Sequence, residues 1–230
     1  MCKNKSVGFT LAEVLITLGI VGVVAAMTIP NLMNYYKAQK LRSQFLKSYS
    51  IVQQVFKQME ADDVSLNPRD YPSAPDTLFY KTFIKYLQAP IDCGNYYTKS
   101  KALPCYDFMG SSAHYKTLNG SADVPVSVFD AGQIVLQDGT LLLFNSDNYG
   151  FWVSVDLNGY NGKPNKFGYD LFTFEFQDGV LRTMGDISTK YQDMSIYCDK
   201  NSKHYFNGIA CANKAKADTD YFKTIVKTYK

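Results

Sequence analysis

Histidine is scarce in this chain: His114 and His204 are the two among 230 residues. So few imidazoles leave little material for histidine-based acid–base catalysis. The serine-nucleophile, zinc-protease and phosphate-loop patterns G-x-S-x-G, H-E-x-x-H and G-x-x-x-x-G-K-[ST] are also missing from the sequence. A cysteine nucleophile would need Cys105 with His114, its nearest histidine, and a disulfide explains Cys105 better. We therefore expect a protein that is not an enzyme.

Strong net charge is missing as well. The formal net charge is +3, which by itself supports neither a dedicated nucleic-acid binder nor an enzyme for acidic substrates. Charged residues make up 20% of the chain and hydrophobic residues 46%, so the chain can bury a sizeable core. The 18 tyrosines and 15 phenylalanines, against a single tryptophan, suit strands and packed loops better than a helical bundle.

The five cysteines fall into an isolated residue, Cys2, and two pairs that are local in sequence. Local pairs in an exported protein indicate disulfides, and the simplest pairing joins Cys93 to Cys105 and Cys198 to Cys211. Two other pairings, free buried thiols and a zinc site remain alternatives. The zinc alternative lacks the C-x-x-C spacing of a zinc knuckle.

The N-terminus combines a short polar leader, residues 1–8, with an apolar run over residues 9–29. A helix of about twenty residues crosses a hydrocarbon core of about 30 Å. Lys3 and Lys5 precede the run and predict a cytoplasmic N-terminus. Ala25 and Ala26 make only a weak signal-peptidase site, so a simple signal anchor is the ordinary interpretation.

One ionisable residue, Glu13, lies four residues into the apolar run. A carboxylate inside a membrane span costs about 2–3 kcal/mol or more unless it lies near the interface or has a partner. Glu13 is therefore a candidate functional residue.

The segment GFTLAE, Gly8 to Glu13, followed by VLI, resembles the prepilin peptidase recognition site of type IV pilins and type II secretion pseudopilins. The resemblance implies cleavage between Gly8 and Phe9 and N-methylation of Phe9. Glu13 then becomes the fifth residue of the mature chain, where this family carries a glutamate. Pro30 matches the helix-kinking proline of these subunits.

The resemblance implies that the chain is a structural subunit. It would be a pseudopilin or minor pilin of a type II secretion or type IV pilus-like filament. Cleavage creates an α-ammonium group at Phe9, and the Glu13 carboxylate of a neighbouring subunit can pair with it and set the axial register. The implied partners are other pilin or pseudopilin subunits, prepilin peptidase, an inner-membrane assembly platform and membrane lipid.

The implied location is the bacterial inner membrane, crossed once, with a cytoplasmic leader and an exported C-terminal domain. From there the subunit would enter a periplasmic or cell-surface filament. The alternative function is a competence-type pilin that binds DNA for uptake, which would need a concentrated basic stripe. We do not expect a nucleic-acid partner, and we interpret the lysine-bearing tail, residues 198–230, as a solvated basic terminus.

Beyond residue 29, hydrophobic periodicity predicts a helix that continues over residues 30–63. Its apolar stripe recurs at intervals of three and four and comprises Leu41, Phe45, Tyr49, Val52, Phe56 and Met59. The remaining chain, residues 64–230, is expected to form a globular head. It begins with a turn-rich region to residue 125 that includes a short helix over 77–87.

From about residue 126 the hydrophobic period changes to two, which predicts strands. Asp138-Gly139 and Asp178-Gly179 are hairpin turns between them. The expected strands are 126–129, 133–137, 140–145, 151–156, 171–177 and 180–184. The fold class is therefore α+β: a long N-terminal helix packed on an antiparallel meander, as in pilins.

The loop between two of these strands, residues 156–170, is rich in side-chain oxygens and resembles a loop that binds calcium in some pseudopilins. The candidate Ca²⁺ ligands are Asp156, Asn158, Asn161, Asn165 and Asp170. The twelfth-position glutamate of an EF-hand is absent and only two carboxylates are present, so we expect a weak site. Asn and Asp also favour turns, and a purely structural loop remains the alternative.

Overall fold

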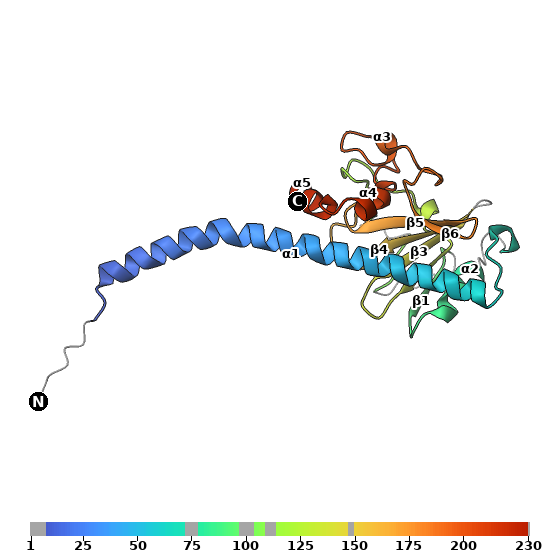
Figure 1. Ribbon diagram of the computed structural model, residues 1–230, viewed down its shortest axis with the longest axis horizontal. Coiled ribbons are helices and arrows are strands. Elements are labelled where there is room, and N and C mark those ends of the chain that lie inside the picture. The colour runs from blue at the N-terminus through green and yellow to red at the C-terminus, as the bar shows by residue number, and fades with distance from the viewer. Residues whose placement is uncertain (1–7, 72–77, 97–103, 109–113, 147–149, 230) are drawn as a thin grey trace, which may run out of the picture.

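The computed structural model describes residues 8–71, 78–96, 104–108, 114–146 and 150–229. Figure 1 shows a single long helix that extends from a head, with the N-terminus at its far end. Of the expected leader, residues 1–8, all but Gly8 lie outside the described residues, as does Cys2.

The long helix α1 runs without interruption from Leu11 to Ala61, 51 residues or about 77 Å. Pro30 lies inside it. Proline has no N–H and cannot donate to the carbonyl four residues earlier, so it weakens the helix locally. On either side of it, Thr28 Oγ1 donates to the Val24 carbonyl at 2.9 Å and Asn31 Nδ2 to the Met27 carbonyl at 3.2 Å. The helix that the sequence predicts on both sides of residue 30 is thus one continuous element.

The C-terminal half of α1 packs on the head along the predicted stripe. Leu41, Phe45, Val52, Phe56 and Met59 are buried. Tyr49 is half-buried, and its hydroxyl donates to the Leu181 carbonyl at 2.9 Å. The stripe reaches the head because residues spaced by three and four share one helix face.

The head contains a six-stranded antiparallel sheet whose strands are in sequence order, so it is a simple meander. Its strands are β1 Ile91–Gly94, β2 Gly132–Val135, β3 Leu141–Ser146, β4 Phe151–Asp156, β5 Leu171–Gln177 and β6 Val180–Thr183. The fold class is α+β, as the sequence predicts, with a long helix against an antiparallel sheet.

Two positions differ from the expected strand order. Val126–Phe129, expected as the first strand, is instead a 3₁₀ turn, η3 (Val126–Val128). Val128 and Phe129 are buried, so their apolar character reflects core packing and not ladder pairing. The true first strand, β1, precedes residue 126; it has four residues and too little alternation to be recognised.

Both faces of the sheet are covered. One face packs on α1 through alternate residues such as Leu142, Phe144, Phe172 and Phe174. The opposite face, which includes Leu141, Leu143 and Trp152, packs under the loops of the head. Polar side chains on this second face pair with one another: Ser154 hydrogen-bonds Thr173 at 2.8 Å, and Trp152 Nε1 donates to Glu175 Oε1 at 3.1 Å.

The shorter helices lie around the sheet. The helix expected over 77–87 forms α2 (Leu78–Phe83), followed by the 3₁₀ turn η2 (Ile84–Tyr86). A further 3₁₀ turn, η1, spans Pro68–Asp70, and the C-terminal part holds α3 (Met194–Tyr197), α4 (Cys211–Ala217) and α5 (Tyr221–Thr228).

The interpretation of the tail as a solvated terminus is wrong, because α5 packs along α1 (Figure 1). The buried residues of α5 are Tyr221, Phe222, Ile225 and Val226. This i, i+1, i+4, i+5 pattern is an amphipathic stripe that the intervening lysines obscure in the sequence.

Two disulfides fasten the head, and they are the two sequence-local pairs. Cys93 bonds to Cys105, with Cα atoms 5.6 Å apart, and Cys198 bonds to Cys211, with Cα atoms 5.1 Å apart. Both separations lie in the usual range for a disulfide.

Candidate functional site: the N-terminal half of the helix and the loop 156–170

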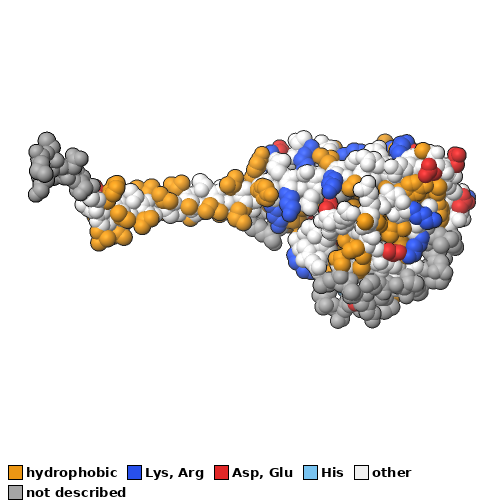
Figure 2. All heavy atoms as spheres, turned by 90° about the horizontal axis from the view of Figure 1, so that it is seen from below, with side chains coloured by type: hydrophobic (Ala, Val, Ile, Leu, Met, Phe, Trp, Pro, Cys, Tyr) orange, Lys and Arg blue, Asp and Glu red, His pale blue; other side chains and the backbone are white. Residues whose placement is uncertain are grey.

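Between Phe9 and Tyr36 the large apolar side chains stand exposed, and Phe9 itself is 90% exposed. Figure 2 shows them covering the rod that projects from the head. α1 is long and apolar enough to cross a membrane, and its most apolar stretch is free of contacts with the head. A helix that is apolar on every side needs lipid or other helices around it. The fold therefore combines a head that has its own buried core with a helical segment that requires an apolar environment.

Glu13 forms the N-terminal cap of α1 together with Thr10. The Thr10 hydroxyl accepts from the Glu13 N–H at 3.2 Å, and the Glu13 carboxylate accepts from the Thr10 N–H at 2.7 Å. This reciprocal pair is a capping box, which satisfies two N–H groups that the helix leaves free. Glu13 lies four residues after Phe9, where a new amino terminus would form, and its cap partner Thr10 follows Phe9 directly.

Gly8, Gly19 and Gly22 are open positions, since a Cβ atom added at any of them meets nothing within 4 Å. Gly19 and Gly22 lie on the exposed part of α1, where small residues allow another helix to approach closely. Gly8 lies just before the helix, so its side of the chain is accessible.

The loop after β4 brings four of the five candidate ligands together. The Asn158 N–H donates to Asp156 Oδ1 at 3.2 Å, and the Asn165 N–H donates to Asp170 Oδ2 at 3.0 Å. The Asn158 side chain also hydrogen-bonds Asp170. The fifth candidate, Asn161, is exposed.

The two carboxyl groups of this loop are fully buried. Burial raises the pKa of Asp156, and the charge of Asp170 raises it further. Burial also raises the pKa of Asp170, although the N–H groups of Lys166 and Asn165 oppose that shift. Within the described ranges neither carboxylate forms an ion pair with a basic side chain.

The residues of this loop suit a hard cation. Two buried amide oxygens, Asn158 Oδ1 and Asn165 Oδ1, have no hydrogen-bond partner. Their amide nitrogens donate to the Lys163 and Tyr160 carbonyls and so leave the oxygens free. Carboxylate and amide oxygens are the ligands that Ca²⁺ prefers. In the part of the chain that the structure describes, no group of three or more His, Cys, Asp or Glu residues gathers, so the loop offers only two anionic ligands.

Sequence reasoning missed Tyr115, whose hydroxyl donates to Asp156 Oδ2 at 2.7 Å. Tyr115 is completely buried, and burial raises its pKa well above the ordinary value. It comes from a segment 41 residues away in sequence, so nothing in the local pattern of the loop points to it.

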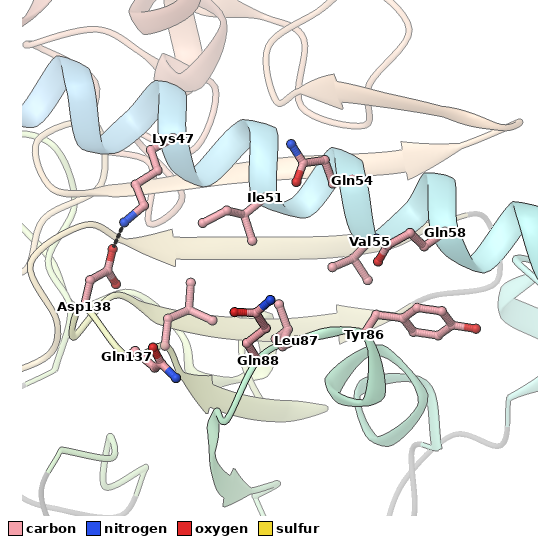
Figure 3. Close-up of a pocket in the computed structure, with 11 residues that line it drawn as sticks. Lys47, Ile51, Gln54, Val55, Gln58, Tyr86, Leu87, Gln88, Gln137 and Asp138 are labelled. Atoms are coloured by element: carbon pink, nitrogen blue, oxygen red, sulfur yellow. Dashed lines mark hydrogen bonds and ion pairs between the residues drawn. The ribbon is translucent and has the colours of Figure 1, made fainter.

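A groove of about 530 Å³ on the head lies between α1 and the β2–β3 turn (Figure 3). Lys47 Nζ donates to Asp138 Oδ2 at 2.6 Å at one end. Ile51, Gln54 and Gln58 line its helix side. The lining is mostly aliphatic and amide, and among its residues there is no nucleophile paired with a base.

Comparison with protein families gives one match. Residues 3–29 match the family model described as the prokaryotic N-terminal methylation motif. Searches of curated proteins and of solved structures gave no match. The chain therefore carries the N-terminal signature of type IV pilins and pseudopilins, and its long helix on an antiparallel sheet is consistent with a pilin-like fold. The motif and the exposed apolar helix together fit a membrane-anchored pilin.

The buried acid pair predicts a pH-dependent stability in the absence of metal. In the unfolded chain the pKa of an aspartate is about 3.9, and in the fold it is raised. The stabilisation that results is complete at a pH below the unfolded pKa and is lost as the pH rises through the folded pKa. In chelator, the melting temperature of the full chain in detergent should therefore fall from pH 5 to pH 8. Asp156→Asn should reduce the pH slope of the free energy of unfolding by up to about 1.4 kcal/mol per pH unit, so its melting temperature should fall less.

The fluorescence of Trp152, the single tryptophan, reports the melting. Asp178→Asn is the matched control, because Asp178 is an exposed turn residue and its change should leave the wild-type slope. Equal slopes for Asp156→Asn and wild type would contradict the assignment of this pH dependence to the buried pair.

Proposed function

We propose that this chain is a structural subunit, a pseudopilin or minor pilin, of a type II secretion or type IV pilus-like filament. Prepilin peptidase cleaves it between Gly8 and Phe9, Phe9 is N-methylated, and the subunit polymerises through α1. The observation that carries the proposal is the coincidence of the methylation motif at residues 3–29 with an apolar helix segment that no described part of the chain covers. A role in assembly uses both features, and catalysis uses neither.

The length of the apolar run supports a helix that crosses the membrane once. The apolar run of residues 9–29 is about 31 Å long as a helix, which matches a hydrocarbon core of about 30 Å. The leader lies on the cytoplasmic side and the head on the exported side. The disulfides Cys93–Cys105 and Cys198–Cys211 fit an exported head, because disulfides persist in oxidising compartments.

Glu13 has one role in the single chain and a second role in the filament. In the single chain its carboxylate caps α1 through the Thr10 N–H. In a filament the carboxylate would also accept from the α-ammonium group of a neighbouring Phe9. A pair of opposite charges in an apolar bundle leaves a large penalty when one partner is lost, so misaligned subunits are disfavoured. The helix proline Pro30 lies on the exported side of this apolar bundle, where it allows local adjustment of α1.

The alternative, a competence-type pilin that binds DNA, receives less support. Several basic residues of the head are ion-paired: Lys47 with Asp138, Lys81 with Asp92 and Lys116 with Asp123. Pairing of this kind cancels the local positive potential that backbone binding to DNA requires.

We also propose that the loop 156–170 binds Ca²⁺ through Asp156, Asn158, Asn165 and Asp170. The free oxygens of Asn158 and Asn165 beside two buried acids support this proposal. A bound cation would supply the positive charge that the two carboxylates lack and would hold the loop between β4 and β5. Asn161 is exposed and is left out of the proposed ligand set.

Leader cleavage is the first prediction. Protein isolated from membranes of cells with active prepilin peptidase should begin at Phe9 and carry one added methyl group, as read by intact mass and N-terminal analysis. Gly8→Val should block cleavage, because the peptidase is expected to recognise the glycine. Since a Cβ atom added at Gly8 meets nothing within 4 Å, the change should leave the fold intact.

Gly19→Val, at another open glycine, is the control and should be cleaved normally. A wild-type chain that still begins at Met1 beside an active peptidase would refute the proposed function.

Assembly through the charge of Glu13 is the second prediction. Glu13→Gln should keep the helix cap, because glutamine also serves at this position of a capping box. It should lower incorporation into sheared filaments more than tenfold, because the neighbour's ammonium group is left unpaired at a cost of about 3–5 kcal/mol. Incorporation is measured by immunoblot in the producing cell.

Glu60→Gln is the matched control, since Glu60 lies on the same helix and pairs with Lys57 at the surface. Normal assembly of the Glu13→Gln subunit would show that Glu13 acts as a cap and not as a charged partner.

Calcium binding is the third prediction. For a calcium dissociation constant of about 0.1–1 mM, calcium at 10 mM should raise the free energy of unfolding of the protein by about 1.4–2.7 kcal/mol. The melting temperature of the full chain should rise with calcium, and Asp170→Asn should abolish the rise. Asp178→Asn should keep it. An unchanged wild-type melting temperature, or an equal rise in Asp170→Asn, would exclude this site.

A further inference from the structure

One face of α1 is left open immediately below the head. Within the head this face is covered, beginning at Ala38. One turn closer to the N-terminus the same face borders a recess of about 240 Å³ that α5 overhangs. The recess is lined by Asn31, Asn34, Tyr35, Lys223 and Lys227. It therefore joins the first turns of α1 after the apolar run to the C-terminal helix.

The recess lies at the depth of lipid headgroups when residues 9–29 span the bilayer. Asn31 and Tyr35 are two and six residues beyond Ile29, or about 3–9 Å along a helix. The headgroup layer on each side of the hydrocarbon core is about 5–8 Å thick. Tyr35 and Tyr36 are both exposed at this level, where tyrosine is enriched in membrane proteins.

Basic side chains surround the rod close to the level of the recess. We define the basic collar as Lys37, Lys40, Arg42, Lys223 and Lys227, and Figure 2 shows basic side chains where the rod enters the head. Residues 31–42 and 218–228 contain these five basic residues against two acidic ones, Asp218 and Asp220. The collar therefore keeps an excess of positive charge.

The lysines of the collar remain able to donate. Lys223 pairs with Asp220 at 2.7 Å, yet its side chain is still 44% exposed. Lys227, on the same face of α5 one turn later, is exposed, and so are Lys37 and Lys40. Asn31 and Asn34 add side-chain amide groups to the same recess.

A basic collar on this side of the span is unusual. Lysine and arginine normally concentrate on the cytoplasmic flank of a membrane helix, and in the proposed orientation the collar lies on the opposite flank. Charge in this position weakens the usual orientation signal, so it calls for a separate function. Basic residues at a membrane surface bind anionic lipid, each with a several-fold effect on affinity.

We propose that the basic collar binds the phosphate groups of anionic phospholipids in the exported leaflet of the membrane. Lys223 and Lys227 close over a headgroup from α5 while Asn31 and Asn34 contact it from α1. Lys37 and Lys40 meet headgroups on other sides of the rod. The contact holds the head down on the bilayer before the subunit is taken into a filament. This inference rests on the membrane anchoring in the proposed function and adds a lipid site to the head.

The experiment uses the full chain in nanodiscs of phosphatidylcholine, with or without phosphatidylglycerol. An amine-reactive reagent modifies the lysines, and mass spectrometry follows the rate at each one. Anionic lipid should slow modification of Lys223 and Lys227 roughly fivefold. Salt at about 1 M, where the Debye length is about 3 Å, should remove the difference. Lys200 and Lys203, exposed between α3 and α4, are internal controls and should react equally in both discs.

A charge-removal variant tests whether the two lysines of α5 act together. Lys223→Gln should raise the reaction rate of Lys227 in anionic discs toward the rate in neutral discs, because both lysines line the same recess. Lys200→Gln removes the same charge elsewhere and should leave the protection of Lys227 intact. Unchanged protection of Lys227 in Lys223→Gln would show that the two lysines do not share a lipid phosphate and would overturn the proposal.

Other outcomes separate the alternatives. Equal rates at Lys223 and Lys227 in neutral and anionic discs would overturn the proposal. Protection of these lysines in neutral discs by inorganic phosphate would assign the recess to a free anion, and protection by duplex DNA would assign it to nucleic acid. Processing at Gly8 is measured on the same preparation. A processed chain without lysine protection refutes the collar alone, and an unprocessed chain refutes the proposed function.

Discussion

The contact between α1 and the sheet fixes the geometry of the whole molecule. Phe56 stacks on Phe176 with ring centroids 4.0 Å apart, and Phe45 meets the edge of Phe172 at 4.9 Å. Buried aromatic pairs of this kind add about 0.5–1.5 kcal/mol each beyond the area that they bury. Because α1 is one helix from Leu11 to Ala61, this contact sets how high the head lies above the membrane segment and how it is turned about the helix axis.

The lysines of α5 depend on the same contact. Phe222 in α5 packs against Phe45 and Phe172, with ring centroids 5.8 and 5.6 Å away. Lys223 follows Phe222 directly, so the aromatic cluster positions the charge as well as the helix. Because α5 docks on the core, Lys223 borders the same recess as Asn34 and Tyr35 of α1. Helix α5 thereby becomes part of the surface of the head nearest the apolar half of α1.

What the sequence predicts well is local. The methylation motif, the apolar run, the stripe on α1 and the two Asp-Gly turns each lie within a short stretch, and each was sufficient for its element. What it could not predict depends on partners far along the chain. β1 is a strand only because β2 pairs with it, and Tyr115 reaches Asp156 from 41 residues away. The burial of Val128 and Phe129 likewise follows from the tertiary core, and their β-branched and aromatic character suggested a strand instead.

The cost of an unpaired carboxylate away from water arises in two parts of the molecule, at Glu13 and at the pair Asp156 and Asp170. Each puts a carboxylate where water is scarce once the protein is in its working environment, and an unpaired charge there is costly. The described chain does not supply a positive charge at either place. Thr10 donates one N–H and one hydroxyl to the Glu13 carboxylate, and Tyr115 donates a hydroxyl to Asp156. A partner that brings positive charge is therefore favoured at both places. In the proposed filament a neighbouring amino terminus would supply this charge to Glu13, and in the proposed calcium site a cation would supply it to the loop, so both proposals depend on the same electrostatic cost.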